Sequence, residues 1–214
     1  MRKYLAEFLG TFLLVAVVVG SGIMAENLSE GNDAVALLGN TIATGAILFV
    51  IIKMFMSISG AHFNPAVSLM FFFRKELDGK NFIIYSLLQI LGGLIGIVAV
   101  HYIFELDIMQ LSNKVRGSNG ALLVSEIIAT TGLILTILFI RKSDESSIAI
   151  GVALFITAGY WFTSSTSFAN PAVTISRIFT DTFTGISPEQ AVYFILGQLS
   201  GCFLAYGIFK IFEE

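Results

Sequence analysis

The tripeptide Asn-Pro-Ala occurs twice in the chain, and each copy opens a short apolar segment. The residues are Asn64, Pro65, Ala66, Asn170, Pro171 and Ala172. Asn is favoured at a helix N-cap and Pro at the first helical position, so each copy predicts a helix start. The apolar segments, roughly 64–73 and 170–180, are shorter than the about 20 residues that a membrane span needs. Both are therefore typical of half-helices that enter a membrane and stop inside it.

The remainder of the chain has the composition of a membrane protein. Of its residues 56% are hydrophobic and 13% are charged, whereas about a quarter of a soluble domain is charged. The mean hydropathy is +0.86. Six stretches are long and apolar enough to span a bilayer. The expected spans are 4–24, 34–57, 81–104, 119–140, 147–166 and 189–211.

Short sequence matches divide the chain into two related halves. AEFLGT at 6–11 resembles SEIIAT at 125–130, and LLQILGG at 87–93 resembles ILGQLSG at 195–201. Each half contains three spans and one half-helix, and because three is odd, the second half must be inverted in the membrane. Inverted halves with broken helices place a transport pathway at the midplane. We expect a first repeat at 1–106, a connecting loop at 107–118 and a second repeat at 119–214.

The inversion explains why both half-helices begin with the same tripeptide. The two helix starts would meet at the membrane centre with their positive dipole ends facing each other. Each Asn would cap its helix with its side-chain oxygen and turn its amide towards the lumen. Such a lumen accepts neutral molecules with acceptor oxygens and excludes cations and protons.

With these motifs the chain resembles the major intrinsic protein family, the aquaporins and aquaglyceroporins. The resemblance covers nearly the whole chain and includes AEFLGTF, SGAHFNPAV, both Asn-Pro-Ala motifs, Gln89 and Gln198. It implies an all-α membrane protein with six transmembrane helices and two re-entrant half-helices in two inverted repeats. It also implies a homotetramer with one pore per subunit. Glu7 and Glu126 are either proton relays or, as the family implies, acceptors for the backbone of the re-entrant loops.

The resemblance places the outer selectivity filter at four positions. They are Thr44, Ala158, Ser167 and Val173. Water-selective members carry an aromatic residue, a His and an Arg at the first, second and fourth positions, and glycerol channels keep the Arg. This chain resembles a bacterial branch with Val in place of that Arg. All four residues are small or medium in size, which predicts a wide filter that lacks a fixed charge.

Three further features leave alternatives open. Arg177 is a displaced filter or vestibule charge that compensates for Val173, a snorkelling residue at the outer rim, or a partner of Asp181. The aromatic residues at 160–162 either narrow the outer mouth or belong to an interfacial belt. His62 would line the pore wall or gate the pore by protonation. His101 is expected to have no particular role.

These features predict a passive channel for water or small uncharged solutes such as glycerol-like polyols, with arsenous acid as a further candidate. The alternatives are a strict water channel, an inverted-repeat secondary transporter and a non-conducting structural membrane protein. We expect no enzyme, because no catalytic constellation is present. We also expect no metal or cofactor, given one Cys and two distant His, and no nucleic-acid partner, because basic residues are few and scattered.

The distribution of basic residues predicts the topology. If the N-terminus is inside, eight of the Lys and Arg residues fall on the cytoplasmic side: Arg2, Lys3, Arg74, Lys75, Lys80, Arg141, Lys142 and Lys210. Lys114, Arg116 and Arg177 fall outside. The positive-inside rule therefore predicts a plasma (inner) membrane protein in the lipid bilayer with both termini in the cytoplasm.

Overall fold

The computed structural model describes residues 1–213, and within them all regular structure is helical. The elements are α1 (Arg2–Leu28), α2 (Asp33–Ser59), α3 (Pro65–Phe73), α4 (Gly79–Ile103), α5 (Asn119–Ser143), the 3-10 helix η1 (Glu145–Ser147), α6 (Ile148–Phe162), α7 (Pro171–Arg177) and α8 (Pro188–Ile211). The expected all-α class is confirmed. The second half-helix ends at Arg177, a few residues earlier than the sequence suggested.

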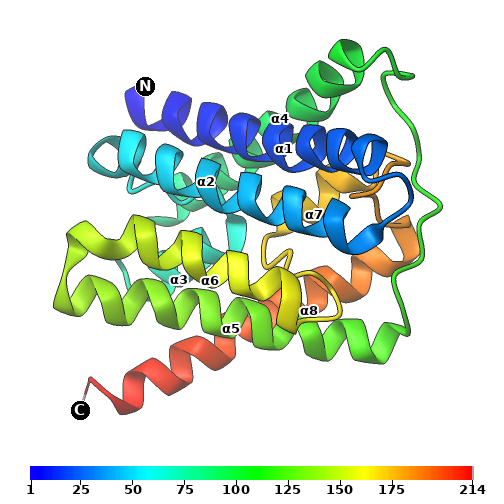
Figure 1. Cartoon of the computed structure of the whole chain (residues 1–214). Helices are drawn as coiled ribbons and strands as arrows, with labels where there is room; N and C mark the ends of the chain where they lie inside the picture. The colour runs from blue at the N-terminus through cyan, green and yellow to red at the C-terminus, as the bar shows by residue number, and fades with distance from the viewer. Residues whose placement is uncertain (214) are drawn as a thin grey trace.

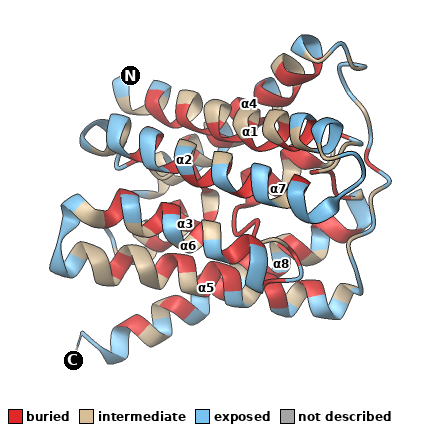
Figure 2. Ribbon diagram, viewed as in Figure 1, coloured by how far each residue is buried: buried red, intermediate tan, exposed pale blue. Residues whose placement is uncertain are grey.

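Six of the helices, counting η1 with α6, are long and apolar enough to cross a membrane, as the sequence predicted. Their outer faces expose large apolar side chains such as Leu87, Leu154 and Val192, while their inner faces are buried (Figure 2). Exposed apolar surface of this extent suits lipid rather than water. The protein is therefore a multi-pass membrane protein. Both termini lie on one side, and the connection from α4 to α5 runs along the opposite side (Figure 1).

The two halves pack in the same pattern. Helix α1 packs along α4 and α2 in the first half, as α5 packs along α8 and α6 in the second, and α2 joins the halves by packing on α6. Glycines allow a close helix crossing in each half. A Cβ atom on Gly92 would lie 2.4 Å from the carbonyl oxygen of Phe8, and one on Gly197 would lie 2.7 Å from that of Leu123. Each half therefore depends on a close backbone contact that admits no side chain.

The half-helices α3 and α7 occupy the space that the long helices enclose. Helix α3 lies towards the side of the termini and α7 towards the opposite side (Figure 1). Both contact α4 and α8, and they also contact each other. Each begins as the motif predicts, because the Oδ1 atoms of Asn64 and Asn170 accept hydrogen bonds of 2.9 Å from the backbone N–H of Ala66 and Ala172.

Candidate pore

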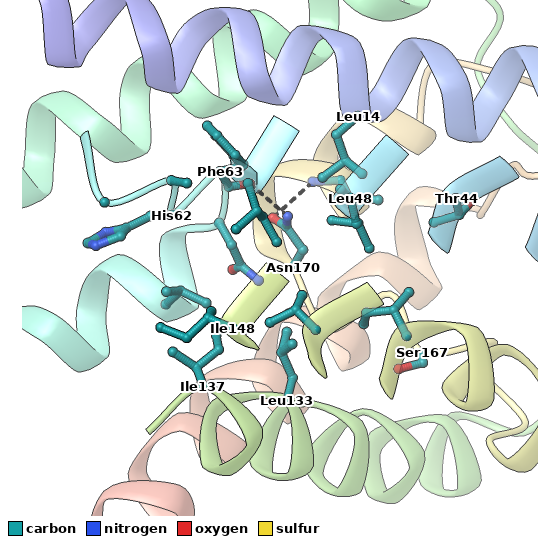
Figure 3. A pocket seen from close by; sticks show the side chains of 18 of the residues that line it. Leu14, Thr44, Leu48, His62, Phe63, Leu133, Ile137, Ile148, Ser167 and Asn170 are labelled. Carbon is teal, nitrogen blue, oxygen red and sulfur yellow. Dashed lines mark hydrogen bonds between the residues drawn. The ribbon is translucent and has the colours of Figure 1, made fainter. Parts of the chain in front are cut away.

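A cavity of about 170 Å³ lies between the two halves, with walls that are mostly apolar. Residues from α1, α2, α5 and α6 line it together with both re-entrant loops. His62 lies at the end nearer the termini, while Thr44 and Ser167 lie at the other end (Figure 3). Asn64 and Asn170 both line the cavity between these ends. The cavity therefore has the position of a pore that passes the two Asn-Pro-Ala motifs.

The two Asn side chains tie the loops to each other across the centre. The Nδ2 atom of Asn64 donates to the carbonyl oxygen of Ala169 at 2.7 Å. That of Asn170 donates to the carbonyl oxygen of Phe63 at 2.9 Å (Figure 3). An amide carries two N–H groups. One on each Asn is thus engaged by the opposite loop, and the other remains for a molecule in the cavity.

The loops that precede the half-helices are strained at matching positions. Ala61 and Phe63 have φ angles of 51° and 49°, and Ser167 and Ala169 have φ angles of 51° and 48°. Non-glycine residues rarely adopt this left-handed region, and each one costs about 1–3 kcal/mol unless its surroundings hold it in place. The residues lie three and one positions before each Asn. The surroundings of both loops must therefore compensate for the strain.

Glu7 supplies that compensation in the first half. It lies on α1, fully buried, and its carboxylate accepts hydrogen bonds from the backbone N–H groups of His62 at 3.0 Å and Phe63 at 2.7 Å. The side chains of Ser59 and Gln89 also donate to it, at 2.6 and 2.7 Å. All four partners are donors, which suits a carboxylate that acts only as an acceptor.

Glu126 repeats this arrangement in the second half. It is fully buried on α5 and accepts from the backbone N–H groups of Phe168 at 3.0 Å and Ala169 at 2.8 Å. Ser165 and Gln198 are its side-chain donors, at 2.5 and 2.7 Å. Neither Glu7 nor Glu126 lines the cavity. The geometry therefore favours the loop-supporting interpretation of both carboxylates over a proton relay.

One of the four expected filter residues does not line the cavity. Thr44, Ser167 and Val173 line the cavity, but Ala158 is exposed on the outer face of α6. The residues of α6 that line the cavity recur every fourth position and end at Tyr160. The hydroxyl oxygen of Tyr160 lies 3.1 Å from that of Thr44. Gapless counting along the span therefore selected a face of α6 that points away from the cavity, whereas the aromatic Tyr160 lines it.

Arg177 is buried, with 2% of its surface exposed, and lines the cavity. Its Nε atom donates to the carbonyl oxygen of Thr184 at 2.5 Å, and its guanidinium lies 3.5 Å from the centre of the Phe168 ring. Asp181 instead accepts a hydrogen bond from the backbone of Asn113 at 3.0 Å. The alternative that paired Arg177 with Asp181 is therefore wrong.

The two His residues have different surroundings. The ring of His62 stacks on Phe71 with centroids 4.6 Å apart and lies 3.1 Å from the hydroxyl of Ser68, so it belongs to the pore wall. His101 is buried and contacts the hydroxyl of Thr180 at 2.8 Å and the carbonyl of Asp107 at 2.8 Å. It links the connection between α4 and α5 to the segment that follows α7, a role that no local sequence pattern indicates.

The cavity ends near an ionic network on the side of the termini. Arg141 lines the cavity and pairs with Glu76, which also pairs with Arg74 at 2.7 Å. Arg74 in turn pairs with Glu213 at 2.8 Å. Across residues 1–213, no group of three or more His, Cys, Asp or Glu side chains is placed to hold a metal ion.

Comparison with known proteins identifies the family to which the chain belongs. The family model described as Major intrinsic protein matches residues 1–147 and 138–214. The chain belongs to the major intrinsic protein family. It is 46% identical over 209 residues to aquaglyceroporin AqpS of Rhizobium meliloti (strain 1021), covering 98% of this chain and 89% of that protein.

More distant relatives agree with this family. Glycerol uptake facilitator protein-like 6 of Lactiplantibacillus plantarum is 31% identical, over 72% of each chain. The crystal structure of the aquaglyceroporin from Plasmodium falciparum matches with a TM-score of 0.76 at 23% identity, covering 95% of this chain and 93% of that one. This structural likeness concerns the fold.

Proposed function

We propose that the protein is a passive channel for water and small uncharged solutes of the glycerol class, and not an enzyme. The observation that carries the proposal is the mostly apolar cavity with one unengaged amide N–H from each Asn-Pro-Ala motif near its centre. A small number of hydrogen-bond donors in an otherwise apolar wall suits a neutral molecule that carries hydroxyl oxygens. The names of the relatives, an aquaglyceroporin and a glycerol uptake facilitator, support the same solute class.

The central motifs would also reject cations. Asn64, Pro65 and Ala66 start one half-helix and Asn170, Pro171 and Ala172 start the other, so two positive helix ends approach the same point. A cation at that point would lose its water shell and meet only donors. The family's exclusion of cations and protons would then depend on these six residues. His62 would serve as a wall residue on the inner side.

The outer filter would consist of Thr44, Tyr160, Ser167, Val173 and Arg177. The sequence predicts a filter of small residues without a fixed charge. Tyr160 would add an aromatic ring to it, and Arg177 would add a charge from one turn beyond Val173. The filter would be narrower and more polar than four small residues would make it. This observation favours a second candidate function, a strict water channel, in which Tyr160 and Arg177 together exclude polyols.

The placement of the protein in its membrane follows from charge. The side of the termini carries most of the basic residues, so the positive-inside rule supports cytoplasmic termini and a plasma membrane location. The family relationship supports a homotetramer with one pore in each subunit. The matching contacts of the halves support the division into repeats at 1–106 and 119–214 with a connecting loop at 107–118.

The experiment that separates the two candidates is stopped-flow light scattering on proteoliposomes. Vesicles are mixed with an impermeant sucrose gradient and, separately, with a glycerol gradient. Vesicles that contain a glycerol channel shrink quickly in both gradients. They reswell only in glycerol, and they do so faster than empty liposomes. Shrinkage without reswelling would support the strict water channel, and shrinkage no faster than that of empty liposomes would refute conduction. Arsenous acid is a further proposed solute, and uptake no faster than that of empty liposomes would remove it.

A further inference from the structure

His101 lies near the end of α4, fully buried and outside the wall of the pore cavity. Its Nδ1 atom lies 2.8 Å from the carbonyl oxygen of Asp107 and 3.1 Å from that of Ile108. Because carbonyl oxygens only accept, Nδ1 carries the proton of the neutral ring. Nε2 then accepts a hydrogen bond from the hydroxyl of Thr180, which lies 2.8 Å away. Both ring nitrogens are therefore used to tie separate segments together.

Thr180 belongs to the outer loop, residues 178–186, which returns to the end of α7. The backbone N–H of Ile186 donates to the carbonyl oxygen of Arg177, the last residue of α7, at 3.2 Å. The loop is tightly packed on itself at Gly185, where a Cβ atom would lie 2.2 Å from the carbonyl oxygen of Thr180. A displacement of Thr180 would therefore be passed to the rest of the loop.

The outer loop in turn holds the guanidinium of Arg177. Its Nε atom donates to the carbonyl oxygen of Thr184, and the guanidinium lies 3.5 Å from the centre of the Phe168 ring. With 2% of its surface exposed, Arg177 is a buried charge, which is costly unless hydrogen bonds hold it. The carbonyl oxygen of the loop is thus part of what keeps this charge in the pore wall.

The guanidinium has another place to go when it is released. Arg177 also lines a second hollow of about 290 Å³, larger than the pore cavity of about 170 Å³. Polar and charged side chains such as Asp33 and Asn40 line much of this hollow. A charged group is more stable among polar groups and water than in an apolar wall. A guanidinium freed from Thr184 would therefore turn into the hollow and leave the pore wider.

We propose that His101 is a positioning residue of the outer filter. Its contact with Thr180 fixes the outer loop, and the loop holds Arg177 in the pore wall. The proposal rests on the channel function above. Loss of the contact frees the loop, and passage of glycerol then gains more than passage of water, because the larger solute depends more on the width of the filter. His101 thus affects solute selectivity without touching the solute.

The test measures glycerol and water permeability by stopped-flow light scattering on proteoliposomes of full-chain variants. Because both are measured on the same vesicles, a smaller amount of folded channel lowers both equally and leaves their ratio unchanged. His101→Asn keeps a donor near the position of Nδ1 but is too short to reach Thr180, whereas His101→Gln reaches it. We expect His101→Asn to raise the ratio of glycerol to water permeability about threefold, the size of the loss of one hydrogen bond. His101→Gln should stay close to the wild type.

Further variants test each link of the argument. Thr180→Val removes the hydroxyl with little change of shape and should raise the ratio as His101→Asn does. Thr11→Val is the matched control, because its hydroxyl is equally buried and donates to the carbonyl oxygen of Glu7 within α1. It should leave the ratio unchanged. In an Arg177→Ala background, His101→Asn should cause no further rise, because the guanidinium is already absent.

The outcomes separate this proposal from the channel function. An unchanged or lower ratio in His101→Asn or Thr180→Val, in vesicles that shrink faster than empty liposomes, would overturn the positioning role alone. An equal rise in His101→Gln or Thr11→Val, or a further rise in the Arg177→Ala background, would overturn it as well. If wild-type vesicles neither shrank nor reswelled faster than empty liposomes, the channel function itself would be refuted, and the positioning role with it.

Discussion

The substitution Glu126→Gln tests whether the buried carboxylates hold the re-entrant loops. The wild-type carboxylate faces four donors, two from the backbone of the loop and two from side chains. A Gln at this position keeps one acceptor oxygen and places an NH₂ group against two of these donors. Gln198 can rotate its amide, because its Oε1 atom is buried without a partner among residues 1–213, and accept from that NH₂ group.

Two losses remain after this rotation. The backbone N–H of Ala169 cannot turn away, and the Nε2 atom of Gln198 no longer donates to the hydroxyl of Thr174. A hydrogen bond to a charged group contributes about 1.5–3 kcal/mol, and an unsatisfied buried donor costs about 1–3 kcal/mol. We therefore expect Glu126→Gln to lower the free energy of unfolding by about 2–4 kcal/mol. For a chain of this length, this corresponds to a fall in Tm of about 10 °C.

The assay is thermal unfolding in detergent, followed by the fluorescence of Trp161, the single Trp of the chain. Glu105→Gln is the matched control, because it makes the same chemical change at an exposed carboxylate. Glu7→Gln should reproduce the loss, since its carboxylate also accepts from four donors. A Tm for Glu126→Gln equal to that of Glu105→Gln, with unchanged water and glycerol flux, would refute the reasoning.

Three further predictions concern the filter and the helix crossings. Tyr160→Ala should speed glycerol reswelling, whereas Trp161→Ala, on the exposed neighbour, should not; equal rates in both variants would contradict a filter role for Tyr160. Val173→Arg should slow glycerol more than water by adding a second guanidinium to the constriction, and unchanged flux of both would remove Val173 from the filter. Gly197→Ala should cost about 1–3 kcal/mol in thermal unfolding by forcing Cβ against a backbone carbonyl, whereas Gly207→Ala, with open space around it, should not lower the Tm.

The sequence by itself determined the fold class and the centre of the pore. Hydropathy over long windows identified the six spans, because lipid requires an apolar surface whatever the tertiary contacts are. The Asn-Pro-Ala motifs marked both half-helix starts, because N-capping is a local interaction between an Asn and the N–H groups that follow it. Both features depend only on residues that are close together in the chain, and these can be read directly from the sequence.

Only the tertiary structure decided which side chains line the cavity. A nearly uniform apolar helix does not show which of its faces points inward, so counting along the sequence selects Ala158, whereas Tyr160 lines the cavity. Arg116 and Arg177 lie 61 positions apart in the sequence and meet at one Phe168 ring because the connection between α4 and α5 folds back over α7. Such contacts between distant segments follow from packing, and no local pattern encodes them.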